Sequence, residues 1–284
     1  MIGFVLLTTL SLASDLDSAI AKIMKARSGA AVVIEVSSGR VLGAYHMEVA
    51  ARRLARPGSA FKPFTLLALL ESGKVKAGDP FSCRRTLRVG KHDLSCTHPD
   101  AGVLQAASAL AYSCNDYFAT NGARLTPEEL HSAFVRAGFN SVTGIAEHET
   151  AGSMQLARTL EERQLQAVGE GEMRVTPMEM VSAYRKLAEH AAQPSESEGV
   201  VIEGLKGSTQ YGMARLASVK GLQVAGKTGT SRTDQGHWTN GWFAGFAPAD
   251  KPEVAVVVFL ERGTGPGDAA PLAGEILSAW QKTK

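Results

Sequence analysis

Strand-like segments lie near both ends of this chain, and mostly helical sequence separates them. The first two, Ala31–Val36 and Arg40–Tyr45, flank a short Ser-Ser-Gly segment, which predicts a β-hairpin. Further strands are predicted near the other end at residues 222–225, 242–246 and 254–260, followed by a helix at 271–280. We therefore expect one sheet assembled from both chain ends.

The middle of the chain, residues 64–192, is predicted to be mostly helical. Thr126 and Thr176 each precede a proline and stand three residues before a glutamate, which is the pattern of a helix that starts with a capping box. Residues 193–199 are polar and predict a surface loop. Together these patterns predict an α+β fold in which residues 15–284 form one domain. Its antiparallel sheet comes from both chain ends, and the helical subdomain is inserted into it.

The overall charge and aromatic content exclude several kinds of partner. The formal net charge is only +2, and lysines and arginines form no long run. Nucleic acid is therefore not expected as a partner, and no polybasic membrane patch is present. An aromatic content of 6% also argues against a base-stacking surface. Gly263–Gly267 is mis-spaced for a dinucleotide loop, so no cofactor is expected.

Residues 1–14 resemble an export signal. The apolar run Ile2–Leu12 has the length of a signal-peptide core and is too short to span a bilayer. The small residues Ala13 and Ser14 could end it, although the usual positive charges before the run are missing. We interpret residues 1–14 as an atypical signal or anchor, with an ordinary first strand or helix as the alternative. Export predicts an extracytoplasmic location, in the periplasm or cell envelope.

Two of the three cysteines, Cys83 and Cys96, flank a segment that looks like a hairpin turning near Gly90. In an oxidising compartment this spacing predicts a disulfide between them. The alternative is a zinc site built from Cys83, His92, Cys96 and His98. Neither a C-x-x-C nor an H-x-x-x-H unit is present, so the disulfide is favoured and no metal is expected. The third cysteine, Cys114, is predicted to be a buried, unpaired thiol.

Three short motifs occur in a fixed order along the chain. They are S-A-F-K at Ser59–Lys62, S-C-N at Ser113–Asn115 and K-T-G at Lys227–Gly229. Each is weak alone, because S-x-x-K arises by chance about once in a chain of this length. Together and in this order they predict acyl-enzyme chemistry with a serine nucleophile and a lysine.

The surroundings of the first motif fit this chemistry. Pro63 is tolerated only in the first turn of a helix, so the helix is predicted to begin at about Ser59. Lys62 then lies one turn later on the same face. A lysine can take the serine proton only if desolvation or another cation lowers its pKa, and Lys227 could supply that cation. Taken alone, Lys62 would be interpreted as a solvated surface lysine.

The K-T-G motif follows the short apolar strand at 222–225. Its glycines would let a substrate backbone lie along the strand edge, and its lysine and threonines could bind a carboxylate. The alternative is a glycine-rich turn at a strand end that carries a stray lysine.

Longer stretches around the motifs resemble the transpeptidase domain of penicillin-binding proteins, especially the class B, monofunctional type. These stretches are Arg56–Pro63, Tyr112–Phe118 and Val168–Met178. This acyl-serine family is shared with β-lactamases, and the resemblance implies a β-lactamase/transpeptidase-like fold. It also implies that peptidoglycan stem peptides and β-lactams are partners, together with cell-wall assembly proteins at the membrane.

The resemblance implies a role for each residue of the first two motifs. Ser59 is expected to be acylated by the penultimate D-Ala of a stem peptide, with loss of the terminal D-Ala. Lys62 is expected to act as the general base. Ser113 is expected to relay protons, and Asn115 to hydrogen-bond the backbone amide of the substrate.

For the third motif, the resemblance implies that Lys227 supports the second-motif serine electrostatically. Thr228, Gly229 and Thr230 are expected to bind substrate, with the two hydroxyls on its carboxylate. The backbone N–H groups of Ser59 and Thr230 are expected to form an oxyanion hole.

Three functions remain open from the sequence: a D,D-transpeptidase or D,D-carboxypeptidase, a serine β-lactamase, and a non-catalytic β-lactam or muropeptide sensor. Intact motifs favour the first. Asn115 stands where class D β-lactamases usually have valine, and the class A E-x-x-L-N string is absent. A penicilloyl ester on Ser59 is therefore expected to be long-lived, unless Glu162 or Glu170 supplies a base. Glu170 itself stands where the family commonly has glutamine.

Overall fold

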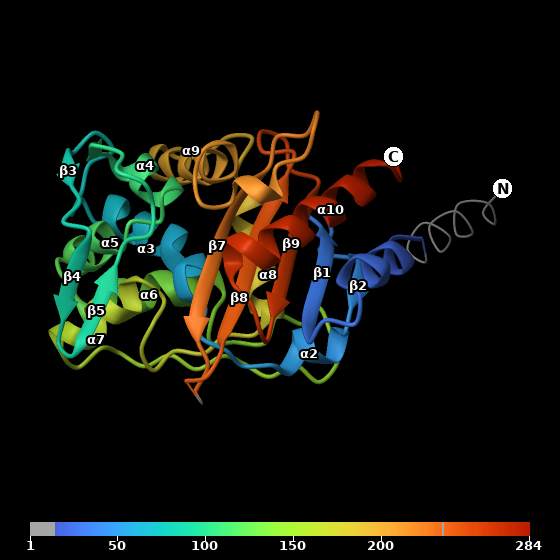
Figure 1. The fold of residues 1–284 in the computed structure, drawn as a ribbon, viewed down its shortest axis with the longest axis horizontal. Coiled ribbons are helices and arrows are strands. Elements are labelled where there is room, and N and C mark those ends of the chain that lie inside the picture. The colour runs from blue at the N-terminus through green and yellow to red at the C-terminus, as the bar shows by residue number, and fades with distance from the viewer. Residues whose placement is uncertain (1–14, 235) are drawn as a thin grey trace.

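The computed structural model describes residues 15–234 and 236–284, so the predicted signal-like segment 1–14 lies outside the described residues. A five-stranded sheet in the order β2-β1-β9-β8-β7 runs through the molecule (Figure 1). Its strands are β1 (Gly29–Glu35), β2 (Val41–Tyr45), β7 (Ala225–Arg232), β8 (Thr239–Ala247) and β9 (Val254–Leu260). Every neighbouring pair is antiparallel.

A strand from near the start of the chain pairs with a strand from near its end in this sheet. β1 pairs with β9 along its whole length, from Gly29 opposite Leu260 to Glu35 opposite Val254. The predicted α+β fold, with a sheet assembled from both chain ends, is therefore confirmed. The predicted hairpin is formed by β1 and β2.

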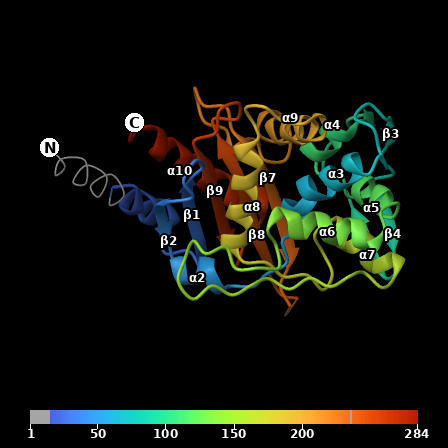
Figure 2. The ribbon, with the colours of Figure 1, turned by 180° about the vertical axis from the view of Figure 1, so that it is seen from behind.

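Helices cover both faces of the sheet (Figures 1 and 2). Alternate residues of β1 point to opposite sides, as in any strand. Ala31 and Val33 belong to a core shared with residues 15–24, which are helical, and with α10 (Ala270–Gln281). Val32 and Ile34 belong to the larger core, which includes α8 (Pro177–Glu189). Full burial of one such side chain stabilises the fold by about 1.5–3 kcal/mol.

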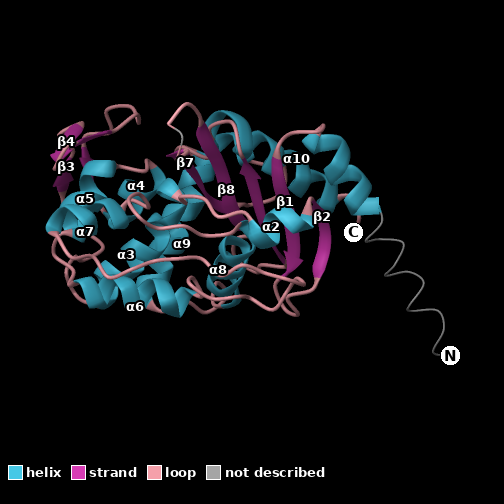
Figure 3. Ribbon diagram, turned by 90° about the horizontal axis from the view of Figure 1, so that it is seen from below, coloured by secondary structure: helices cyan, strands magenta, loops and turns pink. Residues whose placement is uncertain are grey.

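A second group of elements lies beyond the β7 edge of the sheet (Figures 1 and 3). Its helices are α3 (Lys62–Glu71), α4 (Ala106–Ala111), α5 (Asn115–Gly122), α6 (Pro127–Ala137), α7 (Leu160–Ala167) and α9 (Glu196–Gln210). It also holds the short strands β3 (Phe81–Ser82), β4 (Thr86–Val89), β5 (His92–Ser95) and β6 (Val103–Leu104). The remaining elements are α2 (Met47–Arg52), η1 (Gly58–Phe61), η2 (Arg215–Ala217) and η3 (Gly265–Ala269). No helix in the described part of the chain is long and apolar enough to cross a bilayer.

The predicted helix starts at Thr126 and Thr176 are confirmed, since both threonines form capping boxes. The surface loop predicted at 193–199 is wrong in its second half, because α9 begins at Glu196. Ser195 caps this helix in a capping box with Glu198, so the polar residues there serve the helix end.

The strand predicted at 222–225 is also misplaced. Leu222 belongs to a tight turn that bridges back to Val219, and β7 begins only at Ala225. β7 then continues through the K-T-G motif. A polar segment forms this strand because β8 supplies its hydrogen-bond ladder, from Ala225 opposite Phe246 to Arg232 opposite Thr239.

Candidate active site

The S-A-F-K motif forms a tight turn that leads into a helix. Ser59 lies in η1, a 3₁₀ turn, and α3 begins at Lys62. The helix start predicted at about Ser59 is therefore a 3₁₀ turn followed by an α-helix. Pro63 falls within the first turn of α3, where its missing N–H costs no hydrogen bond.

The turn that holds Ser59, η1, packs directly on β7, the strand that contains the K-T-G motif. A Cβ on Gly229 would lie 2.5 Å from the Pro57 carbonyl oxygen and 2.9 Å from the Ala60 nitrogen. A Cβ on Gly58 would lie 2.6 Å from the Thr230 carbonyl oxygen, and Gly58 has a φ of +53°. Only glycine fits either position, so both glycines allow η1 and β7 to lie backbone against backbone.

Two buried aromatic side chains donate hydrogen bonds to backbone carbonyl oxygens in and next to this turn. The Tyr184 hydroxyl on α8 donates to the Ala60 carbonyl oxygen at 2.8 Å. The Trp242 indole N–H on β8 donates to the Arg56 carbonyl oxygen at 2.9 Å. Sequence analysis missed both residues, because a buried aromatic residue in a predicted helix or strand carries no signal that it supports a catalytic turn.

Lys62 is fully buried and directed at the second motif. Its ammonium group donates to the Ser113 carbonyl oxygen at 2.7 Å, the Ser113 hydroxyl at 3.2 Å and the Asn115 side-chain oxygen at 2.6 Å. Burial lowers the pKa of Lys62 from 10.5 to about 8. An amine with this pKa is partly neutral near pH 7 and can accept a proton.

The S-C-N motif stands at the start of α5 in a constrained conformation. Ser113 has a φ of +58°, a left-handed conformation that non-glycine residues seldom adopt. Cys114 caps α5, its sulfur accepting the Tyr117 N–H. The Asn115 side-chain nitrogen donates to the Ser95 carbonyl oxygen at 2.8 Å, which joins the motif to the end of β5.

Lys227 is a second fully buried amine, on β7. It donates to the Thr228 carbonyl oxygen at 3.0 Å. Burial, and to a lesser extent the charge of Lys62, holds its pKa well below 10.5. Thr228 is buried, while the partly exposed Thr230 accepts the Gly265 N–H at 2.9 Å. β7 is an edge strand of the sheet, so one side of its backbone is not paired with another strand.

Glu170 lies among cations beside this cluster. Burial raises its pKa to about 7, against the opposing charges of Arg56, Arg232, Lys62 and Arg174. Glu162, the other acidic residue weighed from the sequence, accepts the Arg158 N–H at the start of α7 and is exposed. The sequence showed Glu170 only as a departure from the family's glutamine, without its surroundings.

The structure brings Lys62, Ser113 and Asn115 together by hydrogen bonds and packs η1 on β7. It forms no hydrogen bond between Lys227 and Ser113 in the described part of the chain. Burial is the main cause of the lowered pKa of Lys227, and the charge of Lys62 lowers it further through space.

The predicted disulfide between Cys83 and Cys96 is wrong for this structure, in which all three cysteines are free. The hairpin itself is present, with Thr86 opposite Ser95 in β4 and β5. Continued beyond the strands, this register sets Cys83 opposite His98 and not opposite Cys96. The Cys96 sulfur instead lies 3.7 Å from the Cys114 sulfur.

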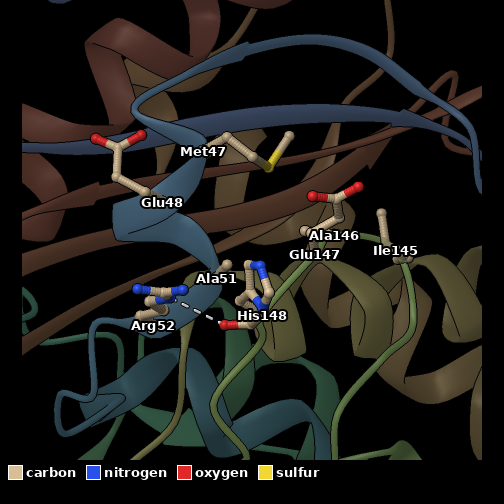
Figure 4. Close-up of a pocket in the computed structure, with 8 residues that line it drawn as sticks. All are labelled: Met47, Glu48, Ala51, Arg52, Ile145, Ala146, Glu147 and His148. Atoms are coloured by element: carbon tan, nitrogen blue, oxygen red, sulfur yellow. Dashed lines mark hydrogen bonds between the residues drawn. The ribbon is translucent and has the colours of Figure 1, made fainter.

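A separate surface pocket of about 480 Å³ lies between α2 and residues 145–148 (Figure 4). Arg52 and His148 close one side of it through a 3.0 Å hydrogen bond to the His148 carbonyl oxygen. The pocket contains none of the motif residues.

The comparisons with known proteins agree with this arrangement. The family model of the penicillin binding protein transpeptidase domain matches residues 29–278, which is most of the chain. The chain therefore belongs to the penicillin-binding protein transpeptidase family.

Two curated relatives show moderate sequence identity to the chain. The chain is 28% identical over 319 aligned residues to a probable peptidoglycan D,D-transpeptidase PenA of Neisseria flavescens, covering 93% of this chain and 77% of that protein. It is 31% identical over 275 aligned residues to stage V sporulation protein D of Bacillus subtilis, covering 78% of this chain but only 41% of that protein.

Solved structures share the fold. The D,D-transpeptidase domain of a peptidoglycan glycosyltransferase from Eggerthella lenta superposes with a TM-score of 0.83 at 24% identity, covering 95% of this chain and 81% of that chain. Pseudomonas aeruginosa PBP2 in complex with WCK 5153 gives a TM-score of 0.81 at 24% identity, covering 94% of this chain and 77% of that chain.

Proposed function

We propose that this chain is a serine-type peptidoglycan D,D-transpeptidase or D,D-carboxypeptidase that forms an acyl-enzyme on Ser59. One observation carries the proposal: Lys62, three residues after Ser59, is a buried amine with a pKa of about 8 held on Ser113 and Asn115. A buried lysine without a carboxylate partner is costly to a fold, and proton transfer is the function that this arrangement serves.

In the proposed acylation, neutral Lys62 takes the proton of the Ser59 hydroxyl. The serine oxygen forms a bond to the carbonyl carbon of the penultimate D-Ala. The carbon–nitrogen bond to the terminal D-Ala then breaks, and the leaving nitrogen receives a proton through Ser113. An amine or water afterwards attacks the ester and frees Ser59.

The substrate is proposed to lie along the free edge of β7. Its carboxylate would be bound by Thr228 and Thr230 beside Lys227, and its backbone amide by Asn115. The close contact of η1 with the Thr230 backbone supports an oxyanion hole made of the Ser59 and Thr230 N–H groups. Each such donor typically contributes about 3–4 kcal/mol to the transition state.

β-Lactams that mimic D-Ala-D-Ala are proposed to acylate the same serine. The description of the matching family, penicillin binding protein transpeptidase domain, supports this assignment. Because peptidoglycan lies outside the cytoplasmic membrane, we place the activity in the periplasm or cell envelope.

The test is labelling of the purified protein with fluorescent penicillin, followed by intact-mass and peptide analysis. One penicilloyl adduct on Ser59 is expected. Ser59→Ala should remove it without lowering the unfolding temperature, while the exposed control Ser218→Ala should label normally. A label that persists in Ser59→Ala, or that maps to Ser113, would disprove the assignment.

A β-lactamase is the second candidate, favoured by one observation. Glu170, with a pKa of about 7 near Lys62, has the properties of a base for hydrolysis of the ester. Against it, Asn115 holds the Lys62 amine and supplies no apolar pocket for a lysine carbamate. We expect a long-lived ester and a single stoichiometric burst with nitrocefin. Sustained turnover that is lost in Glu170→Gln would make the protein a β-lactamase.

A further inference from the structure

Four sulfur and nitrogen donors meet behind the S-C-N motif. Cys83 precedes β4, Cys96 and His98 follow β5, and Cys114 caps α5. One ligand atom from each residue lies within 4.8 Å of all the others. Cys96, His98 and Cys114 are buried, and Cys83 is half-buried at the outer side of the cluster. The acylation chemistry proposed above uses none of these four side chains.

The spacing of these donors is close to that around a tetrahedral zinc ion. Zinc–sulfur bonds of about 2.3 Å and zinc–nitrogen bonds of about 2.05 Å imply sulfur–sulfur edges of about 3.8 Å and sulfur–nitrogen edges of about 3.6 Å. The Cys96 and Cys114 sulfurs are 3.7 Å apart, and the Cys83 sulfur is 3.7 Å from the His98 Nε2 atom. The wider pairs need to close by no more than about 1 Å.

The atoms around the cluster also suit a metal. The His98 Nδ1 atom lies 2.7 Å from the Pro99 carbonyl oxygen. A proton on Nδ1 donated to this carbonyl leaves the Nε2 lone pair directed at the sulfurs, which is how metal-binding histidines are usually held. Backbone N–H groups donate to the Cys83 sulfur at 3.3 Å and to the Cys114 sulfur at 3.4 Å, and such bonds stabilise thiolates.

We propose that Cys83, Cys96, His98 and Cys114 bind a structural zinc ion. Three thiolates and one neutral imidazole fill the four positions of tetrahedral zinc, which leaves no open position for substrate or water. Binding releases the three thiol protons to solvent and leaves one net negative charge on the site. The Arg85 guanidinium lies beside the site and donates to the Cys96 carbonyl oxygen at 3.2 Å.

The ion would join the β4–β5 hairpin to the second motif. Cys114 lies between Ser113 and Asn115, the two residues that hold the Lys62 amine. Ser113 has left-handed backbone angles, and such a conformation persists only where the surroundings fix it. Zinc on Cys114 would provide this constraint, in parallel with the hydrogen bond from Asn115 to the Ser95 carbonyl oxygen.

Metal content is the first test, and it requires no activity, so it stands apart from the proposed function. Full-length protein purified without a polyhistidine tag is equilibrated with zinc, desalted and analysed by plasma mass spectrometry. We expect one zinc per chain. Protein loaded with cobalt should show the strong visible absorption of tetrahedral cobalt and a near-ultraviolet thiolate band. No bound metal, or an octahedral cobalt spectrum, would overturn the proposal.

Ligand variants make the test specific. Cys83→Ser and His98→Ala should each weaken zinc binding at least about 100-fold. Cys83→His keeps a donor and should retain zinc with an altered cobalt spectrum, which separates ligand loss from misfolding. His92→Ala is the matched control, because His92 is exposed on β5 and lies outside the cluster. Wild-type affinity in Cys83→Ser or His98→Ala contradicts the site.

The positioning role is tested by removing and restoring the ion. Chelation should lower both the unfolding temperature and the rate of penicillin acylation, and added zinc should restore both. Acylation that is unaffected by zinc removal would disprove the positioning role. A disulfide between Cys96 and Cys114 in protein isolated from the cell envelope, detected by non-reducing peptide mapping, would overturn the zinc site itself.

Discussion

At the scale of single residues, the site is organised around two buried amines. Lys62 and Lys227 are both fully buried, and burial lowers the pKa of each amine. The Lys62 amine donates to oxygen atoms of the second motif, while the Lys227 amine, among the described residues, donates a hydrogen bond only to the Thr228 carbonyl oxygen. In the proposed acylation, a proton leaving Ser59 would find in Lys62 an acceptor that is desolvated and held by the second motif.

The first prediction follows from the pKa of Lys62, which is about 8. Acylation needs the neutral amine, so its rate should rise with pH and level off above about pH 9. Below the pKa the neutral fraction falls about tenfold per unit, which makes the rate at pH 6 about 100-fold lower than the plateau. Stopped-flow acylation by a chromogenic β-lactam measures this profile, and a flat profile from pH 6 to 9 would contradict it.

Glu170 offers a matched variant for the same measurement. Its negative charge favours the protonated form of Lys62 and so raises the pKa of that amine. Glu170→Gln should therefore move the midpoint of the acylation profile to lower pH, by up to about one unit. Lys62→Arg, which cannot lose its proton near neutral pH, should abolish acylation at every pH tested. A midpoint that moves upward in Glu170→Gln would disprove the assigned base.

At the scale of elements, the contact between η1 and β7 depends on the absence of side chains. The backbones approach so closely that Gly229 has no room for a Cβ beside Pro57 and Ala60. The two nearest atoms there belong to the backbone, which cannot turn away as a flexible side chain would. Gly229 therefore fixes the distance between η1, which carries the proposed nucleophile Ser59, and β7, the strand proposed to bind substrate.

We predict that Gly229→Ala separates η1 from β7. The displacement should slow penicillin acylation by about 100-fold and destabilise the fold by about 1–3 kcal/mol. Gly78→Ala is the matched control, because a Cβ at Gly78 meets no atom within 4 Å. Its stability should change by less than about 0.5 kcal/mol. Labelling kinetics and thermal melting measure both, and wild-type kinetics in Gly229→Ala would refute the prediction.

Elements with strong local signals could be predicted from the sequence, and elements fixed by distant contacts could not. The prolines and glutamates after Thr126 and Thr176 encode their helix starts locally. The polar strand β7 has no such signal, because its ladder comes from β8. The cluster of metal-ligand atoms around Cys114 could not be predicted from the sequence either. The register of the β4–β5 hairpin and the start of α5 bring these residues together only in the folded chain.

At the scale of the whole molecule, each catalytic motif depends on a different region of the chain. The first motif spans η1 and the start of α3, the second leads into α5, and the third lies within β7, an outer strand of the sheet. Sequence order alone predicted that the three motifs act together, because their combination is typical of one chemistry. Their spatial arrangement depends on β1 and β9, which hold the sheet together at its centre.

Removal of β9 and everything after it should therefore prevent folding. A chain that ends at residue 250 lacks β9 and α10, so β1 and β8 each lose a strand partner and one core loses most of its helical cover. We expect no cooperative thermal transition and rapid proteolysis. Deletion of residues 282–284, which follow α10, is the control and should leave a cooperative melt. A cooperative melt in the shorter chain would contradict the central role of β9.

The pairing of β1 with β9 also sets the order of events during biosynthesis. β1 leaves the ribosome early, yet its main partner begins only at Val254. At a synthesis rate of about 5–20 residues per second, β1 waits on the order of ten seconds or more for that partner. Until then, the apolar Ala-Ala-Val-Val-Ile run of β1 lacks the strand that pairs with one of its edges in the folded sheet. The sheet therefore cannot be completed until Val254–Leu260 has been synthesised, so the native pairing of β1 forms late, after most of the chain has been made.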